Sequence, residues 1–416
     1  MVAIAGGDAT AQEETAELNA KLATFPVSRY PVQHATTAFH LATVHLRCGR
    51  LEQAVPLLVT AYRTFGGLGM QLEQTKALMM HGVALREGGR GDLAAETFAR
   101  AVHEFAELEQ PAEEAAASHN LGMALLEHGD PGAAQTALGR AYELFLAEGH
   151  LAQAGAAARE RGVHLLTSGD VAGALLVLDD AAALAHRAGD LPGLGAATNA
   201  LGLAQLALDD PAAAVTEFSR AVGAYPRSLR AAEHAMAKAN LAVAHERVGN
   251  HARARLAARQ ALAISSADPP VRDQALQLLD RLSADTSRDL ITVLDEEPMQ
   301  RWSSILREEV LRWCDASPPD RLLAVRGFMD GMLARPGTSY DLAESLIATI
   351  VELPPTPYAE MVASVVQVAS DLGEREERVR SVMGSAMARF AMPQWQRLAA
   401  SLNEAAADAG LAEGWR

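Results

Sequence analysis

The chain has 416 residues, 49% of them apolar, with 36 lysines and arginines against 52 aspartates and glutamates, a formal net charge of −16. This acidic balance argues against a nucleic-acid phosphate partner and against an anionic membrane surface, because both attract a basic face. The length exceeds one ordinary globular core, so two regions or one elongated repeat structure are expected.

Residues 1–30 are expected to form an N-terminal tail with a possible helix. Residues 1–10 are predicted to be disordered and residues 11–25 to form one helix that packs on the first repeat. The opening stretch lacks the basic segment of a signal peptide. No apolar run of about 18 residues predicts a membrane span. Only two cysteines, Cys48 and Cys314, are present, which excludes a disulfide framework. We therefore expect a cytoplasmic protein.

Residues 31–265 repeat with a period of 40. A small residue recurs at Ala42, Gly82, Gly122, Gly162, Gly202 and Ala242, and a glycine or aspartate at Gly49, Gly89, Gly129, Gly169, Asp209 and Gly249. A large residue recurs in most repeats at Leu58, Phe98, Leu138, Leu178, Phe218 and Ala258. Alanine precedes each of these by four positions and follows each by three. These columns hold their phase over six repeats without a gap, so a repeat architecture is predicted.

Each repeat is interpreted as a pair of helices. The small residue lets the second helix approach the first, and the glycine ends the first helix because it adopts a left-handed conformation without steric cost. Asp130–Pro131 and Asp210–Pro211 match a capping residue followed by proline at the first helical turn. One pair cannot bury its apolar face alone, so the repeats must stack.

This pattern resembles the tetratricopeptide repeat (TPR), most clearly in NLGMALLEHGDPGAAQTALGRA at 120–141 and NALGLAQLALDDPAAAVTEFSRA at 199–221. The resemblance covers roughly residues 34–265 and implies an all-α fold, a right-handed superhelix of helix pairs (α-solenoid). The 40-residue repeats are longer than the usual 34 and are similar to the TPR arrays of bacterial regulators. The tryptophan typical of the first helix is missing from all six.

The remaining sequence is predicted to be helical. Residues 266–284 are expected to form a capping helix, and residues 285–416 a C-terminal helical region of five or six helices, either a small bundle or a continuation of the solenoid. The expected helices, apart from one around Trp302–Trp313, lie at about 320–334, 340–352, 357–372, 375–390 and 394–408. All four tryptophans fall in this region, which could also mediate homo-oligomerisation.

Motifs for catalysis or metal binding are missing from the sequence. The 13 histidines show neither HExxH nor CxxC-type spacing, and there is no G-x-S-x-G elbow or phosphate-binding loop. His45 and His245 occupy one core column and are interpreted as structural. We therefore expect no enzyme, no cofactor and no metal.

The resemblance implies that the first helix of each pair lines a concave groove. The partner-binding positions carried over in this way are His119, Asn120, Met123, Leu126, Arg159, Val163, Leu166, Asn199, Leu203, Leu206, Asn240 and Val243. Asparagines suit the backbone of an extended peptide, because an amide both donates and accepts hydrogen bonds. The aliphatic middle of the groove should be covered either by a partner or by the protein's own C-terminal helices.

The function predicted from these features is an adaptor or scaffold that binds a protein or peptide, for which an amphipathic helix is one candidate. The alternative is a sensor module that binds a small effector or signal peptide and acts through another chain. Neither hypothesis includes a nucleic-acid or membrane partner.

Overall fold

The computed structural model describes residues 2–282, 289–411 and 415, with side chains from Ala11 onward, and those residues form helices and turns without a β-strand. The chain divides into two compact parts, Met1–Leu208 and Asp209–Arg416, which we call the N-terminal part and the C-terminal part. The division falls inside the fifth repeat, whereas the sequence-based boundary at 265/266 follows the end of the repeat columns. Residues 283 and 284 of the predicted capping segment lie outside the described residues.

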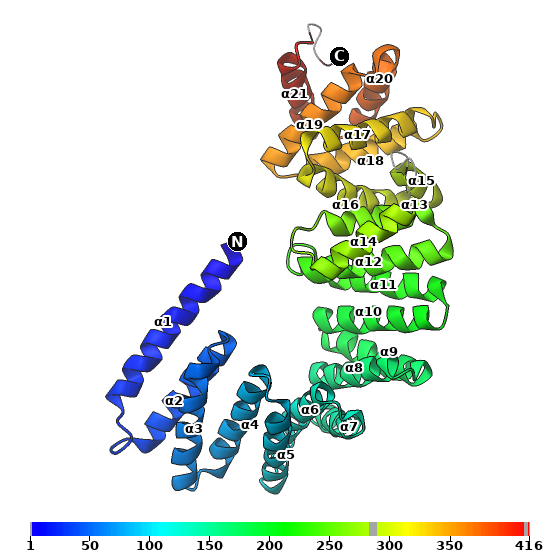
Figure 1. The fold of residues 1–416 in the computed structure, drawn as a ribbon. Helices are drawn as coiled ribbons and strands as arrows, with labels where there is room; N and C mark the ends of the chain where they lie inside the picture. Colours follow the sequence, from blue (N-terminus) through cyan, green and yellow to red (C-terminus); the bar gives the residue numbers. More distant parts are fainter. Residues whose placement is uncertain (1, 283–288, 412–414, 416) are drawn as a thin grey trace. The chain divides into compact units, whose positions relative to one another are not determined.

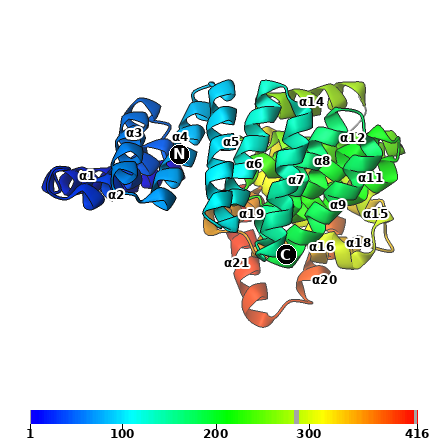
Figure 2. The same ribbon diagram turned by 90° about the horizontal axis from the view of Figure 1, so that it is seen from below.

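The N-terminal part consists of a leading helix and a series of antiparallel helices that follow one another in chain order (Figures 1 and 2). The helices are α1 (Val2–Thr24), α2 (Pro31–Arg47), α3 (Leu51–Gly67), α4 (Gln71–Glu87), α5 (Gly91–Glu107), α6 (Pro111–His128), α7 (Pro131–Ala147), α8 (Leu151–Thr167), α9 (Val171–Ala188) and α10 (Leu191–Ala207). The helix α1 packs on α2 as expected. It begins at Val2, however, within the segment predicted to be disordered, so that prediction differs from the structure.

The turns explain why the repeat is so regular, because the first residues of α3 to α10 are evenly spaced along the chain. The residue two positions before the start of each of these helices has a positive φ. In chain order these residues are Gly49, Gly69, Gly89, Glu109, Gly129, Gly149, Gly169 and Gly189. The same left-handed residue recurs at Asp209 and Gly249. Side-chain oxygens of Asp130 and Asp210 accept hydrogen bonds from Ala133 N at 3.1 Å and Ala213 N at 3.0 Å, which confirms the predicted caps.

The turn at Glu109 gives a first testable prediction. Glu109 adopts a φ of 51°, a region that disfavours side chains by about 1–2 kcal/mol. We expect Glu109→Gly to raise the thermal midpoint measured by circular dichroism, with a gain in stability of up to about 1 kcal/mol after the entropy lost by glycine. The converse change, Gly129→Ala at a φ of 88°, should lower the midpoint by a similar amount. Equal midpoints for both variants would contradict this role of the turns.

The repeat columns coincide with the buried seam between the helices of each pair. The alanine columns and the large apolar column are at most 1% exposed throughout the six repeats. A Cβ atom placed on Gly122 would lie 2.5 Å from Leu138 Cγ, and one on Gly162 would lie 2.5 Å from Leu178 Cγ. Real Cβ atoms do not approach so closely, so glycine is required there because the second helix lies directly against the first.

The C-terminal part completes the fifth repeat, contains the sixth and then changes its packing. Its helices are α11 (Pro211–Ala224), α12 (Ala231–Val248), α13 (His251–Leu262), α14 (Pro269–Arg281), α15 (Asp289–Glu296), α16 (Trp302–Asp315), α17 (Pro318–Leu333), α18 (Ser339–Val351), α19 (Pro355–Ser370), α20 (Glu376–Met387) and α21 (Met392–Asp408), with short 3₁₀ turns at Met299–Arg301 and Gly373–Arg375. The sequence predicted α16 to α21 but not α15.

Helices after α14 pack mainly on the helix two places further along rather than on their chain neighbour. Thus α15, α17, α19 and α21 contact one another in succession, and so do α16, α18 and α20. One continuous apolar core runs through these layers and includes Trp302, Trp313 and Phe328. The helices thus continue to stack in layers, but each packs mainly on the helix two places further along the chain and not on the next one.

The last helix of the array, α13, carries the C-terminal helices on its outer face. Leu256 and Gln260 are buried there by α15 and α16. The equivalents of Leu256 in the preceding repeats are exposed; they are Pro56, Glu96, Thr136, Leu176 and Thr216. Within the C-terminal part, the helices from α15 onward therefore pack on the outer side of the array.

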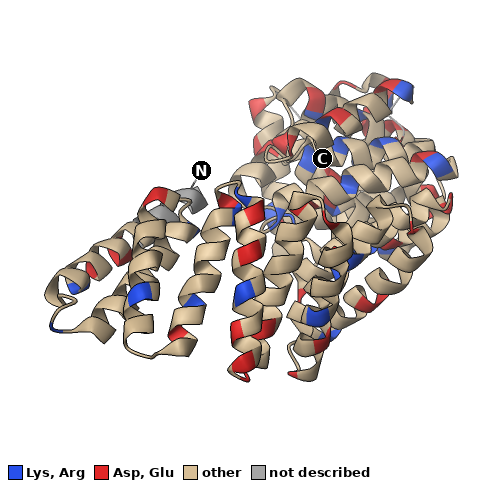
Figure 3. Cartoon of the chain, turned by 60° about the horizontal axis from the view of Figure 1, so that its bottom comes forward, with Lys and Arg blue, Asp and Glu red and all other residues tan. Residues whose placement is uncertain are grey.

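Acidic and basic residues are both distributed over the helices of each part (Figure 3). No helix among the described residues is long and apolar enough to cross a membrane.

Candidate functional site

Ten of the twelve predicted groove residues lie in the N-terminal part, on the first helices of three successive pairs. His119, Asn120, Met123 and Leu126 lie on α6; Arg159, Val163 and Leu166 lie on α8; and Asn199, Leu203 and Leu206 lie on α10. The helices α8 and α10 pack on each other, so their columns adjoin. Val163 and Leu203 occupy the same column and are 37% and 41% exposed, whereas Met123 in that column on α6 is half-buried.

Polar side chains of three helices meet beside this aliphatic column. The pKa of the His119 imidazole is lowered chiefly by burial; the nearby charge of Glu160 opposes the shift, and Arg159 and Arg86 add to it. Arg159 is paired with the adjacent Glu160, and an oxygen of Glu127 lies 4.0 Å from Arg86 Nε. Arg159 and Arg86 are therefore already partnered within the chain.

Asn120 and Asn240, which are expected to bind a peptide backbone, and the further groove residue Asn199 are placed differently from one another. Asn120 is half-buried on α6, whereas Asn199 is buried on α10. Asn240 and Val243 belong to α12 in the C-terminal part. There Gln274 of α14 donates a hydrogen bond to Asn240 Oδ1 at 3.1 Å, and Val243 packs beside Leu278 of the same helix. In the C-terminal part, the helix α14 thus covers the face of α12 that carries Asn240 and Val243.

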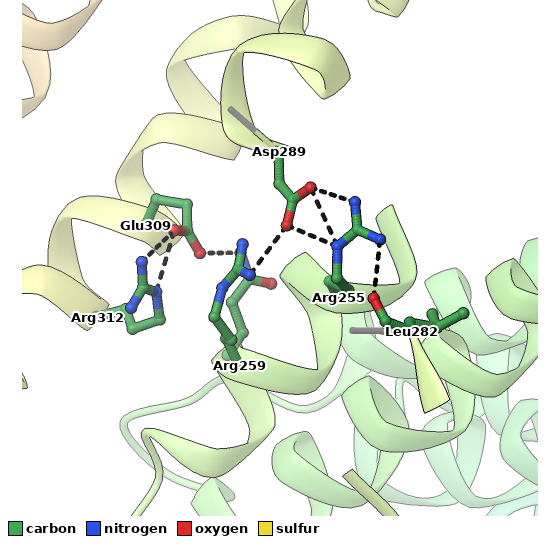
Figure 4. A network of polar contacts seen from close by, with 7 residues as sticks. Arg255, Arg259, Leu282, Asp289, Glu309 and Arg312 are labelled. Atoms are coloured by element: carbon green, nitrogen blue, oxygen red, sulfur yellow. Dashed lines mark hydrogen bonds and ion pairs between the residues drawn. The ribbon is translucent and has the colours of Figure 1, made fainter. Parts of the chain in front are cut away.

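A buried network of charges joins α13 to α15 and α16, and sequence reasoning missed it (Figure 4). Arg255 donates to Asp289 through Nε at 3.0 Å and through Nη2 at 2.6 Å. Arg259 Nη1 donates to Oδ2 of the same carboxylate at 2.9 Å. Arg312 Nε and Nη2 donate to Glu309 Oε2 at 3.0 and 2.9 Å. The contacts of Arg255 and Arg259 with Asp289 join α15 to α13, the last helix of the array, whereas the Arg312–Glu309 pair lies within α16.

The network extends through Gln260 to a buried lysine. Lys238 Nζ donates to Gln260 Oε1 at 2.7 Å, and Gln260 Nε2 donates to Glu309 Oε1 at 2.9 Å. Burial lowers the pKa of Lys238, against the opposing charges of Glu308 and Glu309. Burial alone would raise the pKa of Glu308, but its hydrogen bond with His234 and the charge of Lys238 outweigh this and lower the pKa to about 2.

Two breaks in the repeat columns are the signal that could have revealed this network. Lys238 stands in a buried column that otherwise holds Ala38, Leu78, Ser118, Ala158 and Thr198. Arg255 stands in a column that otherwise holds Val55, Ala95, Gln135, Leu175 and Val215. A charge at a buried, otherwise uncharged position requires a partner from elsewhere in the chain.

The family pattern of the tetratricopeptide repeat matches residues 39–109, 119–192 and 199–269, which is more than half of the chain. The chain belongs to the tetratricopeptide repeat family. Comparison with curated proteins gives no match. TPR arrays are in general protein-interaction folds built by stacking helix pairs.

Several solved structures are similar to this TPR chain at low identity. BtubC (BKLC) from P. vanneervenii is 20% identical with a TM-score of 0.47, covering 51% of this chain and 90% of that one. The apo form of RapI is 12% identical with a TM-score of 0.45, covering 91% and 98%. A kinesin light chain-like repeat protein of Podosopora anserina is 17% identical with a TM-score of 0.39, covering 50% and 94%.

Within residues 11–282, 289–411 and 415 of this TPR protein, no three His, Cys, Asp or Glu side chains are grouped so that they could hold a metal ion. Burial raises the pKa of the Cys314 thiol to about 11, which disfavours the reactive thiolate. Cys48 and Cys314 are both free.

His245 makes the stability of the sixth TPR repeat depend on pH. Burial, followed by the charges of Arg253 and Lys238, lowers its pKa from 6.5 to about 4, with Glu297 opposing. The unfolded chain therefore binds the extra proton, and stability should fall as the pH drops from about 6.5 toward 4, by at most about 1.4 kcal/mol per unit. Urea midpoints at pH 7 and pH 5, followed by tryptophan fluorescence, measure this loss.

The matched variant is His245→Leu, because leucine fills the same column at Leu85, Leu125 and Leu165. Within the described part of the chain, moreover, His245 Nδ1 has no hydrogen-bond partner that the change would remove. It should reduce the difference between the two midpoints. His251→Gln changes an exposed ring nearby and should leave that difference as it is. A midpoint difference that is as large in His245→Leu as in the unmodified chain would refute this assignment.

Proposed function

We propose that this TPR protein is an adaptor whose N-terminal part binds an amphipathic helix of a partner protein along the first helices α6, α8 and α10. The observation that carries the proposal is the aliphatic column of Met123, Val163 and Leu203, which stays partly exposed in a repeat family built for protein interaction. Apolar side chains on neighbouring helices that remain exposed in this way are typical of an interaction surface.

The chemistry of the surroundings supports a helical guest with a polar outer side. Leu166 is half-buried beside the exposed column, and Asn120, His119 and the Arg159–Glu160 pair border it. An amphipathic helix presents apolar anchors at positions i, i+3, i+4 and i+7, which suits a stripe that runs across several helices. Because Arg159 and Glu160 neutralise each other, the border offers hydrogen bonds rather than a net charge.

The test selects binding peptides from a displayed library against the full chain and then measures their affinity for variants. Leu203→Arg places a charge in the aliphatic column and should weaken binding at least tenfold, equivalent to about 1.4 kcal/mol. The matched control is Leu176→Arg on α9, where the leucine is 77% exposed on the outer helix of a pair. That variant should bind as the unmodified chain does.

Both leucines are exposed, so both variants should keep the circular dichroism spectrum of the unmodified protein. Equal affinity of the two variants would sink the proposal, as would selected peptides that bind only the C-terminal part. Selected peptides that lack helical apolar spacing would overturn the helical guest.

A further inference from the structure

The C-terminal part contains a pocket that no function described above uses. Its volume is about 370 Å³, and it opens among helices α13, α15, α16 and α17. The lining residues that matter for its chemistry are Arg259, Glu309, Arg312, Trp313, Leu323 and Phe328. Pockets of roughly 300–1,000 Å³ with apolar walls and a few placed polar groups are typical of small-molecule sites.

The buried charged groups next to this pocket include more cations than anions. The buried network of Figure 4 holds three guanidinium groups, those of Arg255, Arg259 and Arg312, against the two carboxylates of Asp289 and Glu309. Lys238 and Glu308, which join the network through Gln260, form a pair of opposite charges and leave this difference unchanged. Among the described residues of this network, one positive charge therefore lacks a carboxylate of its own, which is costly away from water.

Arg259 is the guanidinium that places this excess positive charge at the pocket. Arg255 already holds Asp289 through two nitrogens, so Arg259 shares an anion that is engaged elsewhere. The Arg259 side chain is 19% exposed and lines the pocket, whereas Arg255 does not line it. A guanidinium has five N–H donors, and a single hydrogen bond to Asp289 leaves several for an incoming anion.

Most of the other lining residues are apolar, and of these Trp313 and Phe328 are buried. The rings of Trp313 and Phe328 lie 6.2 Å apart between centroids at 64°, and Leu323 at the rim is 64% exposed. The buried indole Nε1 of Trp313 has no hydrogen-bond partner among the residues that the structure describes. Asp320 at the rim is exposed and accepts a hydrogen bond from the Ser317 hydroxyl at 2.5 Å, so solvent screens its charge.

We propose that this pocket binds a small organic carboxylate with an apolar body, the carboxylate pairing with Arg259 and Arg312 and the body lying against Leu323 and the Trp313–Phe328 wall. The site lies wholly within the C-terminal part and is independent of the helix-binding surface proposed above. An inorganic anion would satisfy the arginines but leave the exposed side chain of Leu323 uncovered, so the body of the ligand contributes to its selection.

The experiment titrates the full chain, labelled with 5-fluorotryptophan, with phenylacetate, isovalerate, phenylacetamide and inorganic phosphate. Trp313→Phe assigns the resonance of Trp313 among the four tryptophans. A carboxylate should shift that resonance saturably at millimolar concentrations, while phenylacetamide and phosphate should bind at least tenfold more weakly. Absence of a saturable shift with both carboxylates, or equal binding of phenylacetamide, overturns the proposal.

Two pairs of variants separate binding from folding. Arg259→Gln should weaken phenylacetate binding at least tenfold, whereas Arg335→Gln removes a cation that pairs with Asp295 outside the network and should leave the affinity within about twofold. At the exposed rim, Leu323→Lys should strengthen binding severalfold and Leu323→Glu should weaken it. Equal effects within either pair would refute the role of the excess cation, and the Leu323 pair decides the matter if Arg259→Gln does not fold.

Discussion

Gly122→Leu is expected to lower the unfolding free energy of the N-terminal part by about 1–3 kcal/mol or more, because the added side chain meets a packed seam. A Cβ atom there would already lie 2.5 Å from Leu138 Cγ and 3.3 Å from the Ala134 carbonyl oxygen. Circular dichroism during urea unfolding measures the loss. The control is Gly139→Ala in the paired helix, where a Cβ atom would meet only Arg161, at 4.0 Å. This control should stabilise the helix slightly.

The same seam offers a test by compensation. Leu138→Ala alone should cost about 2–5 kcal/mol through the cavity it leaves. Combined with Gly122→Ala, it recreates the pair of alanines found at Ala242 and Ala258 in the sixth repeat. The double variant should therefore be less destabilised than the sum of the single changes. Strict additivity would mean that the two columns are not in contact.

The second large effect is expected at the buried network, where Asp289→Asn should destabilise the C-terminal part by about 3–5 kcal/mol. The change leaves Arg255 and Arg259 in the interior without the carboxylate that both of them bind. The control lies on the same helix: Asp295 pairs with Arg335 at the surface, and Asp295→Asn should cost at most about 1 kcal/mol.

Tryptophan fluorescence is the suitable measurement for this pair of variants, since all four tryptophans lie in the C-terminal part. The urea midpoint should fall strongly for Asp289→Asn and hardly move for Asp295→Asn. Similar midpoints for the two variants would show that the network contributes no more than a surface ion pair.

The periodic part of the fold could be predicted from the sequence because its contacts join helices that are neighbours in the chain. Gly122 and Leu138 lie on the consecutive helices α6 and α7, and every repeat places its two equivalent residues at the same spacing. The left-handed turns at Gly129 and Gly169 are local as well and follow from residue type. Periodicity thus records which faces are buried within each pair.

The contacts of the C-terminal helices produce no periodic pattern in the sequence. Arg255 meets Asp289 from 34 residues away, and Gln260 meets Glu309 from 49 residues away, each once in the chain. The helix α15 was missed because it is only 8 residues long, which is too short for a helical period to stand out in the sequence. Lys238 and Arg255 stand out as exceptions within their columns, but an exception indicates that a partner exists without indicating which residue it is.

The candidate groove was predicted through the repeat columns, and its helix-binding role in the N-terminal part stays a prediction. The columns placed Val163 and Leu203 on adjoining helices, where both are partly exposed. The columns could not distinguish these residues from Asn240 and Val243, because the same repeat position is covered by α14 in the C-terminal part. What covers a repeated position depends on the neighbouring helix, which the column itself does not describe.

Because the left-handed turns are evenly spaced, the array can lose or gain residues without disturbing its packing only in units of a whole helix pair. Removal of residues 111–150 would excise one whole pair and join Gln110 to Leu151 at an equivalent turn, so every later helix would keep its role. Removal of residues 131–150 alone would put α8 in the place of α7, and Ala158 would stand where Leu138 fills the seam. Natural or designed length variants of this chain should therefore differ by whole pairs of helices. The loss or gain of a single helix should mismatch the buried residues of every later pair.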